Sequence, residues 1–299
     1  MTTNDEAKRI QLADGRMLAY QEYGAPDGKP IFYFHGHPGS RLDWAAFDSR
    51  DAATELNARV VAVERPGHGL SDFKRNREIL DWPDDVAELA DTLEVDRFGV
   101  LGISGGGPYA AACAFKIPER VTTTAIVCGM GPAEATGAKT GTAWKFAAGR
   151  SSLMRTIVLT LMSFGLRKKP ETFISQMHDA LNGADKALLL DNPGFARKVI
   201  ELGFAEAFRQ GIGGVRHDAG LYASPWGFRL QDITAEVHLW HGEEDGNVPV
   251  SVGRYVAEAL PNCHARFIEN EGHLSVPYKY VREYLSVLVA SVVAVPQSR

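Results

Sequence analysis

The chain has 299 residues, of which 45% are hydrophobic and 23% are charged, a balance that is ordinary for a folded globular protein. The formal net charge is -5 and there is no long basic run, which argues against a nucleic-acid partner, because nucleic-acid binding needs clustered Lys and Arg. The short basic run at 167–169 is interpreted as the solvated end of a helix.

Neither end of the sequence predicts a membrane segment. The first ten residues lack the apolar core of a signal peptide, and the apolar stretch at 285–295 is too short to span a bilayer. That stretch is interpreted as the tail of an amphipathic helix, and we expect a cytoplasmic protein. The chain has three cysteines without CxxC spacing, and Cys113 and Cys128 lie in apolar stretches, which favours reduced structural thiols.

The first part of the chain predicts strands and helices in alternation. Residues 8–12 and 16–23 predict a hairpin around Asp14-Gly15, and the unbroken apolar run at 31–36 predicts a strand covered on both faces. Such alternation implies parallel strands joined by helical crossovers. Helices are then expected at 43–57, 82–95 and 106–116, and strands at 59–64, 97–103 and 122–130.

From Gly131 to Thr234 the pattern becomes almost wholly helical. Asn192-Pro193 predicts a helix start, with Asn as the cap and Pro in the first helical position. The segment 153–166 is apolar over most of its circumference, so we expect it to be sandwiched between the sheet and the rest of the insertion, or to line a cavity.

Alternation resumes after the insertion. Strands are expected at 236–242 and 264–269, and helices at 250–260 and 278–292. We therefore divide the chain into an α/β sheet domain, residues 1–131 and 236–299, and an inserted helical unit, residues 132–235.

The strongest local signal is Gly102-Ile103-Ser104-Gly105-Gly106, a Gly-x-Ser-x-Gly pattern between a predicted strand and a predicted helix. A turn this sharp strains the backbone of Ser104, so the residues two positions away on either side must be small. The following helix directs partial positive charge at the serine hydroxyl, which suits a developing oxyanion. A glycine-rich turn without chemistry is the disfavoured alternative.

A serine hydroxyl needs a nearby base before it acts as a nucleophile, and the base needs an orienting acid. Among nine histidines His273 is the best base, because it directly follows the last predicted strand, on a loop at the carboxyl edge of the sheet. His238 and His264 fall in predicted strands and are interpreted as structural, and His178 lies in the insertion.

The acid is expected where the preceding strand ends, at Glu243, Glu244 and Asp245. Asp245 is favoured because the tight turn 246–249 follows it and could hold a buried carboxylate; the two glutamates are the rivals. The order Ser, Asp, His along the chain is the order of a triad built on a parallel sheet of this type.

Two backbone N–H groups are expected to form an oxyanion hole: that of Gly105, after the nucleophile, and that of His37, in the loop after the strand 31–36. The His37 side chain then faces the pocket, as a wall residue or as a substrate contact. No metal or cofactor site is predicted, because the pair His35-x-His37 has no nearby carboxylate and Gly67-x-Gly69 lacks the third glycine of a dinucleotide fingerprint.

Together these motifs resemble the α/β-hydrolase superfamily, in order and in spacing. The resemblance implies a mostly parallel eight-stranded sheet with helices on both faces and a helical cap inserted after the sixth strand. It also implies oxyanion donors at His37 and Gly105. The segments that carry it are HGHPGS (35–40), ERPGHGLSD (64–72), GISGGGPYA (102–110), HGEEDGNVP (241–249) and GHLS (272–275).

The nucleophile type narrows the activity that the resemblance implies. Members with an aspartate nucleophile cleave epoxides or carbon–halogen bonds, so Ser104 disfavours both activities. The HGHPG segment is also similar to the prolyl aminopeptidases, but the acidic cap residues with which those enzymes bind the substrate amine are not identifiable in this sequence.

We therefore expect a serine hydrolase that cleaves a small or medium carboxylic ester, with lactones and acylglycerols as options, through an acyl-enzyme. The alternatives left open are a carbon–carbon bond hydrolase, an amidase or aminopeptidase, a cofactor-free peroxidase, and a slow-turnover ligand receptor with the same triad. The expected partner is a small-molecule substrate, and the oligomeric state stays open, with a homodimer as one option.

The insertion is expected to supply an apolar substrate pocket. Trp226, just before the chain re-enters the sheet, is placed near the mouth of this pocket, with plain packing between cap and core as the other option. The apolar candidates for the pocket are Phe146, Met154, Met162, Phe164, Phe204 and Trp226.

Overall fold

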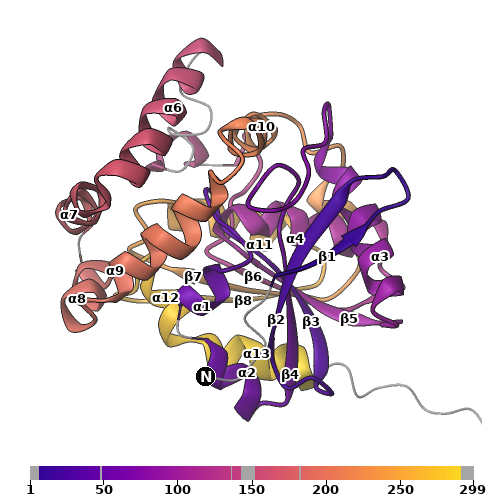
Figure 1. The fold of residues 1–299 in the computed structure, drawn as a ribbon. Helices are drawn as coiled ribbons and strands as arrows, with labels where there is room; N and C mark the ends of the chain where they lie inside the picture. The colour runs from indigo at the N-terminus through magenta and orange to yellow at the C-terminus, as the bar shows by residue number, and fades with distance from the viewer. Residues whose placement is uncertain (1–6, 48, 136, 143–151, 182, 291–299) are drawn as a thin grey trace, which may run out of the picture.

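A computed structural model describes residues 7–290, except residues 48, 136, 143–151 and 182 (Figure 1). Eight strands form one sheet in the order β1-β2-β4-β3-β5-β6-β7-β8. The pairs β1–β2 and β2–β4 are antiparallel and the other five pairs are parallel, as the alternating pattern predicted. The strands are β1 (Lys8–Gln11), β2 (Met17–Gly24), β3 (Lys29–Phe34), β4 (Ala58–Val63), β5 (Phe98–Ile103), β6 (Val121–Val127), β7 (Val237–Gly242) and β8 (Cys263–Ile268).

Helices cover both faces of the sheet (Figure 1). One face packs against α3 (Trp82–Thr92), α4 (Gly107–Lys116) and α11 (Val250–Ala259), and the other against α2 (Arg50–Glu55) and α13 (Val281–Ala290). Alternate residues of β3 supply the two cores, because side chains along a strand point to opposite faces. Phe32 and Phe34 belong to the first core, and Ile31 and Tyr33 to the second.

Several predicted boundaries in the sheet domain are wrong, and two of them have a clear local cause. The helix expected at 43–57 is two short helices, α1 (Asp43–Ala46) and α2; the Ser49 hydroxyl donates to the carbonyl of Phe47 between them, a local bond that competes with a continuous helix. The strand expected at 122–130 ends at Val127, because Cys128 turns out of it with a φ of +47°.

The insertion between β6 and β7 is helical, as predicted. Its described α-helices and π-helix are α6 (Ser152–Lys168), α7 (Pro170–Ala180), α8 (Gly183–Asp191), α9 (Phe195–Lys198), the π-helical stretch η4 (Val199–Ala205) and α10 (Gly213–Tyr222), and two short 3-10 helices are η3 (Ala138–Thr140) and η5 (Leu230–Asp232). Asn192-Pro193 does not open a helix, since α9 begins at Phe195. The Asn192 amide instead donates to the carbonyl of Leu188 (3.1 Å) and ends α8.

The expectation that 153–166 is enclosed on several sides is wrong. One side of α6 is buried, through Leu159 and Leu166, against Phe208 and Val215 within the insertion. The other side is open to solvent because α6 is the outer layer of the insertion (Figure 1). Its exposed apolar residues, with exposures between 44% and 72%, are Leu153, Met154, Ile157, Leu161 and Phe164. The basic residues 167–169 follow at the exposed helix end, as predicted.

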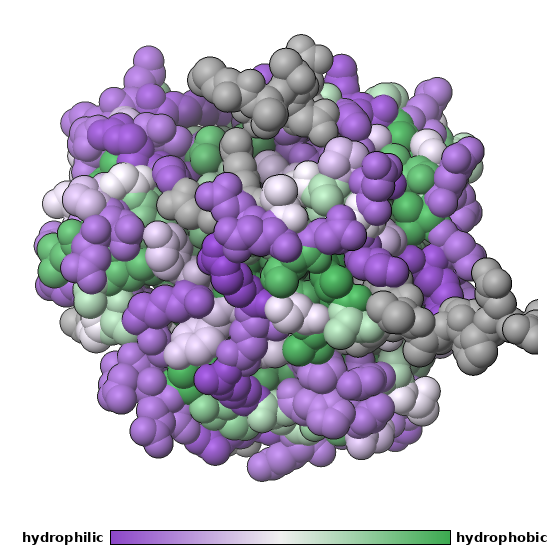
Figure 2. All heavy atoms as spheres, turned by 90° about the horizontal axis from the view of Figure 1, so that it is seen from below, coloured by the Kyte–Doolittle hydropathy of each residue, from purple (hydrophilic) through white to green (hydrophobic). Residues whose placement is uncertain are grey.

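The face of the molecule in Figure 2 is mostly hydrophilic, and hydrophobic residues gather there only in small areas between polar ones. Among the helices of the described residues, none is long and apolar enough to cross a bilayer. All three cysteines are free thiols, and burial raises the pKa of each. A raised pKa keeps the nucleophilic thiolate scarce, which agrees with a structural role for these cysteines.

Candidate active site

Ser104 stands between β5 and α4, where the short 3-10 helix η2 (Ser104–Gly106) joins the two. Its φ is +53°, in the left-handed region that strains a residue with a side chain. A Cβ atom on Gly102 would overlap the carbonyl oxygen of Gly106, and one on Gly106 would overlap that of Phe34. Both positions therefore require glycine, as the motif predicted.

The structure brings the predicted base and acid next to Ser104. The Nε2 atom of His273 lies 2.9 Å from Ser104 Oγ, and its Nδ1 atom lies 2.7 Å from Asp245 Oδ2. All three side chains are buried. Because Nδ1–H donates to the carboxylate, Nε2 is left to accept the serine proton, which is the arrangement that activates a serine nucleophile.

The turn after Asp245 holds its carboxylate, as expected. Oδ1 accepts the backbone N–H groups of Asn247 and Val248, each at 2.8 Å. Of the two rivals, Glu243 pairs with Arg254 (2.6 Å) and Glu244 is exposed. Asp245 is therefore the carboxylate that orients His273.

Asp245 and His273 shift each other's pKa. Burial alone would lower the pKa of His273, but the charge of Asp245, the hydrogen bond to it and the charge of Asp185 raise it above 6.5. Burial alone would raise the pKa of Asp245, but His273 beside it holds that pKa below 3.8. At neutral pH Asp245 is thus charged and the imidazole is more basic than usual, which suits a general base.

The two expected oxyanion donors lie side by side near the serine. A Cβ atom on Gly105 would stand 3.2 Å from the backbone nitrogen of His37, so η2 and the loop after β3 are in contact. The His37-Pro38 bond is cis, and the His37 ring packs edge-on against Tyr222 at 5.1 Å between centroids. Burial lowers the pKa of His37 to about 3, so its side chain is a neutral part of the pocket wall.

A cavity of about 360 Å³ opens beside Ser104 and His273. This volume suits a small or medium organic molecule. One polar group in it is the carboxyl of Asp43, which accepts hydrogen bonds from the backbone N–H groups of Ser40 and Gly36. These bonds lower its pKa, but burial has the larger effect and raises the pKa to about 7. The apolar wall is formed by Ala46, Phe47, Ile103, Phe173, Met177, Leu181, Val199, Ile200, Phe204 and Leu274.

The prediction that Trp226 lies at this pocket is wrong. Trp226 is buried in the core on the α4 side of the sheet, and it packs against Phe228, which in turn stacks on Phe115 of α4 at 5.1 Å. It lines a different hollow, with Pro132 and Arg229.

Among the other apolar candidates, Phe204 alone lines the cavity beside Ser104. Met154 and Phe164 are exposed on α6, and Met162 of the same helix packs against the apolar cluster within the insertion. Phe146 lies outside the described residues.

Asp185, which was not among the predicted site residues, reaches the site from α8 of the insertion. Its buried carboxylate accepts the backbone N–H groups of His273 (2.8 Å), Leu274 (3.0 Å) and Ser275 (2.9 Å). These hydrogen bonds hold the loop of His273 against the insertion. No local signal marks this residue, because its partners lie 88 to 90 positions further along the chain.

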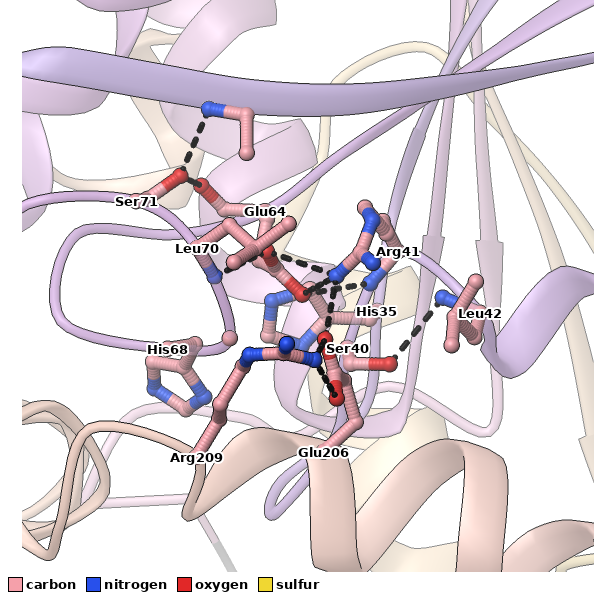
Figure 3. Close-up of polar contacts among 12 residues, drawn as sticks. His35, Ser40, Arg41, Leu42, Glu64, His68, Leu70, Ser71, Glu206 and Arg209 are labelled. Atoms are coloured by element: carbon pink, nitrogen blue, oxygen red, sulfur yellow. Dashed lines mark hydrogen bonds and ion pairs between the residues drawn. The ribbon is translucent and has the colours of Figure 1, made fainter. Parts of the chain in front are cut away.

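A second cluster ties the insertion to the loop after β3 (Figure 3). Arg41 Nη1 donates to Glu64 Oε1 at 2.8 Å and to Glu206 Oε1 at 2.7 Å, and Arg209 approaches Glu206 from the other side. Near it, Ser40 Oγ donates to the carbonyl of Leu202 in η4 (2.7 Å). The core and the insertion are thus joined by buried charge pairs as well as by apolar contacts.

The His35-x-His37 pair does not form a metal site. His35 Nδ1–H donates to the carbonyl of Gly36 (2.9 Å), and its Nε2 accepts the backbone N–H of Arg65 (3.2 Å). Both ring nitrogens of His35 are therefore used by the backbone, and neither is left for an ion.

This architecture matches that of a known protein family. A family model described as alpha/beta hydrolase fold matches residues 29–280, which run from β3 through the loop of His273. The chain belongs to the α/β-hydrolase fold family. This α/β-hydrolase is 27% identical over 260 residues to a bifunctional esterase/perhydrolase from Acinetobacter calcoaceticus, an alignment that covers 85% of this chain and 88% of that protein.

Another curated relative is the dihydrolipoyllysine-residue acetyltransferase component of the acetoin cleaving system from Pseudomonas putida. It is 28% identical over 249 residues, and the match covers 82% of this α/β-hydrolase but 60% of that longer protein. An alpha/beta hydrolase fold protein from Nakamurella multipartita has a TM-score of 0.71 at 22% identity, with 96% of this chain and 100% of that chain covered. That likeness shows the shared fold.

Replacing Asp185 with Ala removes three hydrogen bonds from the loop 273–275, so we expect kcat/KM for an ester to fall by about 10²-fold, the usual effect of a small misplacement of a catalytic group. Steady-state hydrolysis of p-nitrophenyl butyrate measures this. Asp191→Ala, at an exposed position at the end of the same helix, is the matched control and should keep the wild-type value. Wild-type kcat/KM in folded Asp185→Ala would contradict the role.

The raised pKa of His273 sets the pH dependence. Neutral imidazole is the form that accepts the serine proton, so kcat/KM should rise with pH through a pKa above 6.5. Asp185→Asn removes one charge that raises this pKa, so the acidic limb should move to lower pH. A pH profile of kcat/KM for both proteins tests this, and a wild-type midpoint below 6.5 would count against it.

Proposed function

We propose that this α/β-hydrolase is a serine hydrolase that cleaves small or medium carboxylic esters, lactones and acylglycerols included, through an acyl-enzyme. The observation that carries the proposal is the continuous hydrogen-bonded series Ser104–His273–Asp245 at the edge of an apolar cavity. The esterase/perhydrolase named above aligns with 85% of the chain, which supports acyl-transfer chemistry.

In the proposed reaction Ser104 Oγ attacks the ester carbonyl carbon while its proton passes to His273 Nε2. Asp245 stabilises the imidazolium, and the N–H groups of His37 and Gly105 bind the oxyanion. Collapse of the tetrahedral intermediate expels the alcohol, which takes the proton from Nε2. Water then gives a proton to His273, attacks the acyl-enzyme and releases the acid and the free serine.

The cavity walls indicate the part of the ester that is recognised. They are mainly aliphatic and aromatic, so a hydrophobic acyl or alcohol group gains free energy by leaving water there. Phe173 and Met177 of α7 and Phe204 of η4 are among the insertion residues that form this wall. We propose on this basis that the insertion 132–235 acts as a cap that selects the substrate.

Perhydrolysis is a second candidate, favoured by the name of the Acinetobacter relative. Hydrogen peroxide would take the place of water in the second half of the reaction. Its oxygen attacks the acyl carbon, its proton passes through His273 to Ser104, and a peracid leaves. A peracid assay with and without peroxide separates the two outcomes.

Replacing Ser104 with Ala removes the nucleophile, and we expect ester turnover to fall by about 10⁴-fold or more while the fold is kept. Hydrolysis of p-nitrophenyl esters and circular dichroism measure the two properties. Ser286→Ala, on α13, is the control and should stay active. Retained turnover in folded Ser104→Ala would rule the mechanism out, and a burst without steady turnover in the wild type would indicate a receptor.

A further inference from the structure

A buried polar cluster that the proposed reaction does not use lies next to the loop after β3. Its side chains come from the loops after β3 and β4, from α4 and from α10 of the insertion. A buried polar group destabilises the fold unless it forms hydrogen bonds. The hydrogen-bond partners of these side chains therefore indicate what the cluster holds in place. The members are His35, Arg65, His68, Arg77, Tyr109 and Asp218.

Arg65 aims its donors at two neighbouring carbonyl groups of this loop. Nη1 donates to the carbonyl of His35 at 2.6 Å, and Nη2 donates to that of Gly36 at 2.7 Å. Its Nε donates to Asp218 Oδ2 at 2.8 Å, and the ring of Tyr109 packs on the guanidinium. The side chain is wholly buried, so the guanidinium has one orientation.

Asp218 anchors this guanidinium from α10. Its carboxylate also accepts hydrogen bonds from Tyr109 (2.9 Å), His68 (3.1 Å) and Arg77. Burial alone would raise the pKa of Asp218, but Arg77 and Arg65 hold it well below its usual value. A charged carboxylate of the insertion therefore fixes Arg65 against the loop.

The carbonyl of Gly36 and the N–H of His37 belong to the same peptide unit. A hydrogen bond to the carbonyl of a peptide polarises its N–H and makes it a stronger donor, and a charged donor has the larger effect. In the peptide of the other expected oxyanion donor, Gly105, the carbonyl of Ser104 accepts the N–H of Met130 at 3.0 Å. The carbonyl group of each of these two peptides thus accepts a hydrogen bond, and for the Gly36–His37 peptide the donor is the cation Arg65.

We propose that Arg65 is a positioning residue that orients and polarises the His37 peptide toward the oxyanion, with Asp218 of the insertion as its anchor. The inference rests on the proposed ester hydrolysis. A residue with this role stabilises the tetrahedral intermediate more than the bound ester, so its loss lowers kcat and leaves KM nearly unchanged. A residue that only packs lowers the stability of the fold instead.

The test compares Arg65→Gln and Arg65→Lys with the wild type in two measurements. The first is kcat and KM for p-nitrophenyl butyrate. The second is the inhibition constant of a trifluoromethyl ketone, whose adduct with Ser104 carries the same oxyanion. For Arg65→Gln we expect kcat to fall and the inhibition constant to rise, each about 10²-fold, the usual effect of losing one oxyanion donor. Arg65→Lys keeps the charge without the two-pronged geometry and should fall between.

The control is Arg16→Gln, which breaks the pairs of Arg16 with Asp14 and Asp85 away from the site and should keep wild-type kcat and inhibitor affinity. A wild type that neither hydrolyses the ester nor binds the ketone refutes the proposed function. An active wild type with unchanged kcat and inhibitor affinity in Arg65→Gln refutes the role of Arg65. Should Arg65→Gln not fold, Arg65→Lys decides on the same two criteria.

A second cluster, independent of the site, lies on the surface where β7 pairs with β8. His238 and His264 face each other in register, with ring centroids 4.9 Å apart. Glu236 lies two residues before His238, and its Oε1 is 2.7 Å from His238 Nε2 and 3.5 Å from His264 Nε2. The three ligand atoms all lie within 4.8 Å of one another.

We infer that these three side chains bind a zinc ion on the surface of the sheet, with water in the remaining position. Two imidazoles and one carboxylate are a ligand set that zinc takes at about 2 Å each, within reach of small side-chain rotations here. His264 and Glu236 are exposed, so the ion has direct access. The ion would link the edge strand β8 to β7 at the end of the strands opposite Asp245.

Calorimetric titration of the metal-free chain with zinc chloride tests this site. We expect the wild type to bind one zinc ion that both His238→Gln and His264→Gln lose, with a rise in melting temperature on zinc addition that they also lose. His178→Gln, on α7, is the control and should keep both properties. No binding, or binding that survives in His264→Gln, overturns the inference, whatever the result for ester hydrolysis.

Discussion

The position of the candidate site depends on the parallel pairing of neighbouring strands. The pairs are β3–β5, β5–β6, β6–β7 and β7–β8. The carboxyl ends of parallel strands open at one edge, so the loops after β3, β5, β7 and β8 meet there. Ser104 and His273 are 169 positions apart in the chain, yet their side chains form a hydrogen bond. A slip of one residue in any strand would turn the side chains of each core to the opposite face of the sheet, where they would not fit the other core. This cost keeps the register and hence the site in place.

The insertion adds a second constraint to this edge. Three of its carboxylates, those of Asp185, Glu206 and Asp218, reach the loops of the core, and each accepts hydrogen bonds from residues far away in the chain. A buried carboxylate without such partners would destabilise the fold, so these pairs fix the insertion and the loops against one another. The alignment of the expected base and oxyanion donors thus depends on residues on both sides of the cavity.

The site residues that could be predicted from the sequence stand at the ends of strands with clear periodicity. Ser104 lies in a motif whose glycines are required by close backbone contacts, and Asp245 and His273 directly follow apolar runs. Asp185 and Asp218 could not be found in this way, because the groups they bind become neighbours only through folding. Trp226 was misplaced because a large aromatic residue fits the core and a pocket wall equally well by composition.

The errors in helix prediction have similar causes. An apolar stretch such as 153–166 indicates that some burial is needed, but it does not say how many sides find a neighbour. The segment 43–57 has helical composition, and the hydroxyl of Ser49 interrupts it by a bond to the local backbone. These are tertiary and local side-chain effects that a periodic pattern does not contain.

The packing of α7 has a consequence for how this enzyme family can change. The helix lines the cavity with Phe173 and Met177, yet none of its residues is buried, and the carboxylates that hold the site come from other parts of the insertion. Mutations on α7 can therefore reshape the chamber without moving the loops of the candidate site. A library of variants confined to this helix would explore new specificities at little risk to the proposed reaction.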